Sequence, residues 1–108
     1  MSTTAHFIAR LKYFTSKEGG RTTAAYSGYR PHIKFDGRNE LTSGQQVFIG
    51  TDHVNPGESA DAEITIISTS VFEHYLYPGL KFHFAEGPNI IGTGEIIKVL
   101  DKSLEKNT

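Results

Sequence analysis

The chain has 108 residues, a formal net charge of −1 at pH 7 and no cysteine. This length suits one domain, and the missing cysteines exclude disulfides and thiolate metal sites. The near-zero charge disfavours a strongly nucleic-acid-seeking protein, although basic residues dominate the first half of the chain and acidic residues the second. No apolar run reaches the roughly 20 residues that span a membrane, and residues 1–6 lack the features of a signal peptide, so we expect a soluble, cytoplasmic protein without a membrane partner.

Apolar and polar residues alternate along most of the chain, which is the signal of half-buried strands. The alternation predicts strands over residues 7–13, 32–36, 46–49, 62–67, 80–84 and 90–100. Short strands at this spacing are typical of a barrel or a sandwich, and we favour a closed barrel because closure leaves no exposed sheet edges. The fold class is therefore expected to be all-β, with the barrel over residues 1–101 and a charged, flexible tail over residues 102–108. The pairing of residues 36–54 stays open.

Chemistry-bearing motifs are largely missing from the sequence. The histidines lack the spacing of a zinc site, and neither a phosphate-binding loop nor a nucleophile elbow is present. Gly92-Thr93-Gly94 begins like a dinucleotide fingerprint, but Ile97 stands where the third glycine would be. We expect these two glycines to allow a bend or a close approach inside a strand instead. The sequence therefore predicts no catalytic residue, no metal and no cofactor, and an enzyme with a site assembled in space is the least favoured hypothesis.

One block of the sequence is specific. Residues 16–23 (Ser-Lys-Glu-Gly-Gly-Arg-Thr-Thr), followed by residues 26–31 (Tyr-Ser-Gly-Tyr-Arg-Pro), resemble the C-terminal barrel domain, domain III, of bacterial elongation factor Tu. Further blocks agree in order, at residues 56–58 before the fourth predicted strand and at residues 79–82, 86–87, 91–94 and 98–100 of the last hairpin. The resemblance spans about residues 5–100. It implies a six-stranded antiparallel closed barrel made as a stand-alone protein.

The resemblance also implies which partners are available to such a barrel. In the full factor the domain lies against a GTPase domain and a second barrel, and it touches the T stem of aminoacyl-tRNA and the exchange factor. The residues that hydrolyse GTP belong to a domain that this chain lacks, so no GTP site is expected here. The RNA- or partner-binding residues implied are Arg21, Thr22, Thr23, Arg30, His32, Glu86 and Gly87.

Several positions depart from the family's pattern. Thr22 replaces a histidine and His32 a glutamine, while Ala85 and Asn89 stand where the family has arginines. Two missing cations should weaken binding to RNA phosphates and flatten its dependence on salt. The implied residues also have a structural interpretation, since Arg21 could pair with a carboxylate within the barrel.

Two main functional hypotheses follow from the sequence. The first is a non-catalytic, translation-factor-like module that binds a protein partner through the barrel surface, as a mimic, a regulator or an immunity-type protein. The aromatic residues Phe72, Tyr75 and Tyr77 would form its contact surface. The alternative is a small RNA-binding domain that contacts the T arm of tRNA. The sequence does not name an individual partner.

Overall fold

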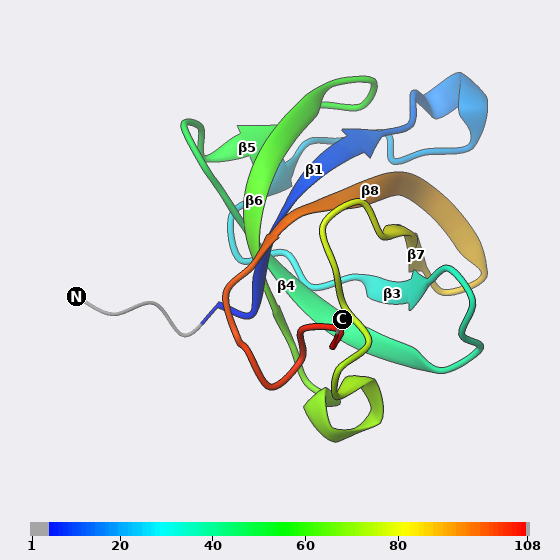
Figure 1. The fold of residues 1–108 in the computed structure, drawn as a ribbon. Helices are drawn as coiled ribbons and strands as arrows, with labels where there is room; N and C mark the ends of the chain where they lie inside the picture. The colour runs from blue at the N-terminus through cyan, green and yellow to red at the C-terminus, as the bar shows by residue number, and fades with distance from the viewer. Residues whose placement is uncertain (1–4, 108) are drawn as a thin grey trace.

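Six strands of the computed structural model, which describes residues 5–107, close into an antiparallel barrel (Figure 1). Their order around the barrel is β1-β6-β4-β3-β7-β8, and each strand pairs antiparallel with both neighbours. The strands are β1 (Phe7–Tyr13), β3 (His32–Phe35), β4 (Leu41–Phe48), β6 (Ser59–Ile66), β7 (Lys81–Glu86) and β8 (Asn89–Val99). The predicted all-β, six-stranded closed barrel is confirmed. No helix among the described residues is long and apolar enough to cross a membrane.

Short elements that the sequence did not predict lie between the barrel strands. They are η1 (Ser16–Glu18), η2 (Thr69–Phe72) and a small antiparallel sheet of β2 (Ala25–Tyr26) and β5 (His53–Val54). Two-residue strands and single helical turns are too short to produce a periodic pattern.

Strand β4 differs from its prediction. It begins at Leu41, whereas alternation predicted a strand only over residues 46–49. Two polar residues on its inward face, Thr42 and Gln46, are 3 % and 0 % exposed, and they interrupt the apolar pattern that marks a buried strand face. Residues 41–43 pair with β3 and residues 44–48 pair with β6, which gives the pairing of this part of the open segment 36–54.

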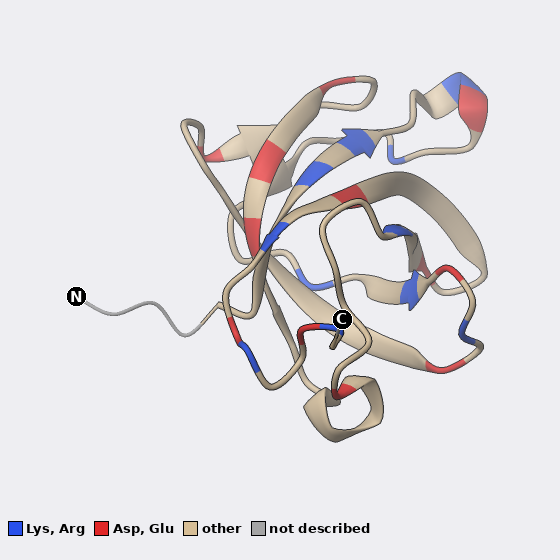
Figure 2. Cartoon of the chain, in the orientation of Figure 1, with Lys and Arg blue, Asp and Glu red and all other residues tan. Residues whose placement is uncertain are grey.

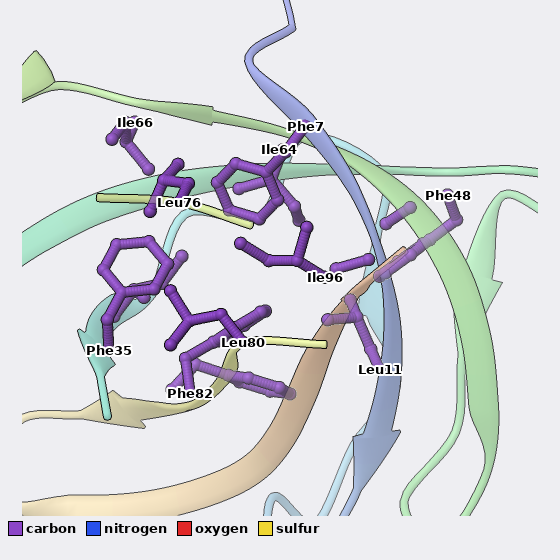
Figure 3. Packing of buried hydrophobic residues seen from close by; sticks show 14 of the residues in the cluster. Phe7, Leu11, Phe35, Phe48, Ile64, Ile66, Leu76, Leu80, Phe82 and Ile96 are labelled. Carbon is purple, nitrogen blue, oxygen red and sulfur yellow. The ribbon is translucent and has the colours of Figure 1, made fainter. Parts of the chain in front are cut away.

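Aromatic side chains fill the barrel (Figure 3). The rings of Phe7, Phe35 and Phe82 contact one another edge to face, with centroids 5.6 to 6.0 Å apart. Gly94 lies against this group, because a Cβ built on it would be 2.3 Å from Cζ of Phe82. Gly92 is equally close to Cζ of Phe84, so the two glycines allow the close approach expected from the sequence.

The C-terminal segment differs from the free tail that was expected over residues 102–108. Leu104 is completely buried in the hydrophobic core, and its carbonyl accepts a hydrogen bond of 2.8 Å from the amide of Leu76. A single leucine among charged residues produces no periodic signal, so the sequence pattern did not indicate this contact. Residue 108 lies outside the described residues.

Candidate binding site at the barrel rim

The loop after β1 is built by a capped helical turn. The side chain of Thr15 accepts a hydrogen bond from the amide of Glu18, and the Glu18 carboxylate accepts one of 2.8 Å from the amide of Thr15. Gly19 ends the turn with φ of 93°, and a Cβ on Gly20 would lie 2.3 Å from the carbonyl oxygen of Phe14. The Glu-Gly-Gly part of the block is therefore required by the backbone, which turns here and leads into Arg21.

Arg21 is the centre of a polar cluster. Its Nη1 forms an ion pair with the carboxylate of Glu86, and the Tyr29 hydroxyl donates a hydrogen bond to the same carboxylate oxygen. Its Nε donates to the carbonyl of Thr23 at 3.2 Å, and its Nη2 donates to the hydroxyl of Thr23 at 3.2 Å and to the carbonyl of Ala24 at 3.3 Å. The guanidinium also lies over the Tyr29 ring, 4.7 Å from its centroid. We call Arg21, Thr23, Tyr29 and Glu86 the rim cluster.

The rim cluster joins three segments that are far apart in the sequence. Arg21 and Glu86 are separated by 65 positions, and Tyr29 leads into β3. Burial, followed by the hydrogen bond to Glu86, raises the pKa of Tyr29 above the ordinary tyrosine range, so its hydroxyl stays a donor at neutral pH. Burial also raises the pKa of Tyr13, whose hydroxyl donates to the side-chain oxygen of Gln46 in the core. The cluster thus fixes the loop after β1 to the β7–β8 hairpin.

The other residues implied by the resemblance surround this cluster. Thr22, Arg30, His32 and Gly87 are all exposed. His32 is opposite Ala85 on neighbouring strands, and Gly87, with φ of 55°, forms the turn of the β7–β8 hairpin. The structure therefore brings Arg21, Thr23 and Glu86 into direct contact and places Thr22, Arg30, His32 and Gly87 on the exposed surface of the segments that the cluster joins.

The family model of the elongation factor Tu C-terminal domain matches residues 1–100. The chain belongs to this family. The elongation factor Tu C-terminal domain is a non-catalytic, translation-factor-like barrel, which agrees with the six-stranded fold.

One of the three aromatic residues predicted as a contact surface, Phe72, does not reach the surface of this elongation factor Tu-like barrel. Phe72 is completely buried, with its ring centroid 5.1 Å from that of Phe35, and it is therefore part of the core. Tyr75 is half-buried and its hydroxyl donates to the carbonyl of Asp36, whereas Tyr77 is exposed. Arg38 lies over the rings of both Phe72 and Tyr75, 5.3 and 4.9 Å from their centroids. The sequence interpretation failed because a 3-10 turn directs Phe72 inward from a segment that was expected to face solvent.

Metal chemistry has no visible basis in the part of the barrel that the structure describes. Among these residues no group of three or more histidine, cysteine, aspartate or glutamate side chains could hold an ion. The rim cluster itself contains one carboxylate, one guanidinium, one phenol and one hydroxyl. Sequence reasoning missed Tyr29 as a member of this cluster, although its position between Gly28 and Arg30 in the family block was the available signal.

Proposed function

We propose that this chain is a non-catalytic, translation-factor-like module that binds a protein partner at the barrel rim. The observation that carries this proposal is the ion pair of Arg21 with Glu86. The side chain of Arg21 is 19 % exposed, and each of its three nitrogens already donates to a group of this chain, in Thr23, Ala24 or Glu86. Arg21, the cation that the family resemblance assigned to RNA phosphate, is thus paired with the Glu86 carboxylate of the same chain.

The remaining charges make the rim nearly neutral. Of the implied binding residues with a formal charge, Arg21 and Glu86 neutralise each other, which leaves Arg30. RNA affinity depends on several cations that each neutralise a phosphate, and Ala85 and Asn89 supply no charge here. Part of the basic first half lies against acidic residues of the second half, because β1 pairs with the more acidic β6 and Arg10 pairs with Asp61 at 3.0 Å (Figure 2).

The exposed chemistry of the rim suits a protein surface. Thr22 and Thr23 offer hydroxyls, and the β7–β8 hairpin exposes Pro88 and, at 44 %, Ile90. Interfaces between proteins are poor in charge at their centre and combine apolar contact with scattered hydrogen bonds. The rim cluster holds the two loops in place before binding, which reduces the entropy lost on association.

The test is capture of partners by the tagged full chain from lysate of its source cell, with and without ribonuclease. Two isoleucines of the same strand provide a matched pair, since Ile90 at the rim is 44 % exposed and Ile97 is 43 % exposed. We expect a protein that is retained after ribonuclease, lost with Ile90→Asp and kept with Ile97→Asp. Loss of every retained protein on ribonuclease treatment would contradict the proposal.

A second candidate function is binding to the T arm of tRNA. It is favoured by one observation, namely that Arg30 and His32 are both exposed on either side of Pro31 at the start of β3. Titration of tRNA at low and moderate salt tests it, because each phosphate contact contributes about one unit to the salt slope. A salt slope of about one or less would mean that Arg30 makes the single phosphate contact. This result would reject a specific RNA site.

A further inference from the structure

The C-terminal residues 101–107, which we call the strap, lie along the loop between η2 and β7. The amide of Leu76 donates to the carbonyl of Leu104 at 2.8 Å, and the amide of Lys106 donates to the carbonyl of Leu76 at 2.7 Å. The amide of His74 adds a hydrogen bond of 3.1 Å to the carbonyl of Ser103. Leu76 and Glu105 form a parallel β-bridge, and Figure 1 shows the red end of the chain beside this loop. Only the contacts on either side of Leu76 are those of one strand beside another, because residues 102–104 form a turn in which the amide of Leu104 donates to the carbonyl of Asp101 at 3.0 Å.

One side chain anchors the strap. Leu104 is 0 % exposed and belongs to the core cluster, whereas Lys102, Ser103, Glu105 and Lys106 are all exposed. A short peptide bound to a protein surface combines the same two kinds of contact, in that backbone hydrogen bonds give affinity and a buried side chain gives specificity. The strap thus occupies its groove in the manner of a bound peptide.

The wall of the groove is formed by residues that are unusual for a simple connecting loop. His74 has φ of 57°, which is uncommon for a residue with a side chain. Both its amide and its Nδ1 contact the strap, the latter 3.0 Å from the carbonyl oxygen of Glu105. Outliers of this kind concentrate at sites that bind something.

The family match includes the groove but does not include the strap. It ends at residue 100, so Leu76 and the rest of the groove belong to the barrel domain and the strap follows it. The outer end of the strap is also incompletely packed, since a hollow of about 430 Å³ lies between Tyr77, Pro78, Glu105, Lys106 and Asn107. The strap is held by one buried side chain, by hydrogen bonds to His74 and Leu76 and by Lys106 over the Tyr77 ring, 5.0 Å from its centroid. A terminal segment with one neighbour opens more readily than barrel strands that pair on both sides.

We propose that the groove along residues 73–77 is a peptide-binding site for a short segment of a partner protein that contains a turn like that of residues 102–104. The segment pairs its backbone with Leu76 and inserts a leucine-like side chain where Leu104 now lies. The strap is the resident occupant that this segment displaces. The site is distinct from the rim cluster, and it does not depend on what the rim binds.

The proposal is tested with a synthetic, acetylated peptide of residues 101–108 and the full-length chain labelled for NMR. Leu104→Asp removes the anchor and should open the groove, while Leu41→Asp alters a leucine that is 59 % exposed and should leave the strap bound. In the wild type the strap competes with the peptide for the groove at a millimolar effective concentration. We therefore expect the peptide to bind at least about tenfold more tightly to Leu104→Asp than to the wild type. The amide of Leu76 should shift on binding, and the same peptide with aspartate in place of its leucine should not bind.

A folded Leu104→Asp variant that ignores the peptide, or equal affinity for this variant and Leu41→Asp, would overturn the proposal. Hydrogen exchange of the wild type provides an independent test that survives if Leu104→Asp does not fold. The amides of Leu76 and Lys106 should exchange at least about tenfold faster than that of Ile96 in β8, because the strap opens locally. Equal protection of these three amides would show that the strap is a fixed part of the core and would also overturn the proposal.

Discussion

Replacing Arg21 by methionine should destabilise the barrel, because the guanidinium holds the rim cluster together. The change keeps an apolar stem and removes the ion pair with Glu86 and hydrogen bonds of 3.2 to 3.3 Å to Thr23 and Ala24. A partly exposed ion pair contributes up to about 1 kcal/mol, and long hydrogen bonds contribute about 0.5 kcal/mol each. We therefore expect a loss of about 2 kcal/mol, which corresponds to a fall in Tm of about 10 °C for a domain of this size.

Equilibrium unfolding in urea of the wild type, Arg21→Met, Glu86→Gln and the double variant measures this directly. The double-mutant cycle should give a coupling of about 1 kcal/mol between the two side chains. The control is Arg10→Met, because the Arg10–Asp61 pair is 69 % and 37 % exposed and its loss should cost clearly less than the loss of Arg21. If Arg21→Met costs no more than Arg10→Met and the coupling is zero, Arg21 is not held by Glu86. The inference that the rim is nearly neutral would then fail.

Two further predictions concern the core and the strap. Gly94→Ala places a methyl group 2.3 Å from Cζ of Phe82 and should lower the free energy of unfolding in urea by about 1–3 kcal/mol. The loss should be smaller in a Phe82→Leu background, and an equal loss in both backgrounds would contradict the steric explanation. The hydroxyl and amide of Ser103 hydrogen-bond the carboxylate of Asp101 and lower its pKa, so this contact stabilises the strap above the ordinary aspartate pKa of about 3.9 and is lost as pH falls through the lower value. At neutral pH the strap amides should therefore be better protected from exchange in the wild type than in Asp101→Asn, and this difference should disappear in acid, where Asp101 is protonated. Identical pH profiles of the two proteins would refute this.

The barrel could be predicted from the sequence because its inward residues are mostly apolar and alternate. Strand β1 illustrates this, since Phe7, Ala9, Leu11 and Tyr13 are all at most 1 % exposed. The beginning of β4 could not be predicted in this way, because Thr42 and Gly44 take the inward positions there. Alternation of hydrophobicity has no means of indicating a buried polar residue.

The candidate site could be predicted only in part. The family block identified Arg21 and Glu86 separately, but a contact between residues 65 positions apart leaves no local pattern in one sequence. Because Arg21 pairs with Glu86, its role is that of a structural ion pair and no longer that of a free cation. The strap was missed for a related reason, since Leu104 docks on a distant loop as a single apolar residue among exposed ones.

The most direct test of the rim as a protein-binding surface is site-specific photo-crosslinking in the source cell. A benzophenone side chain is placed at Thr22, beside the rim cluster, or at Thr93, an equally exposed position on the outer face of β8. The account predicts crosslinking from position 22 to a protein, unchanged by ribonuclease, and none to that protein from position 93. Crosslinks from position 22 to RNA alone, or equal crosslinking of the protein from both positions, would contradict it.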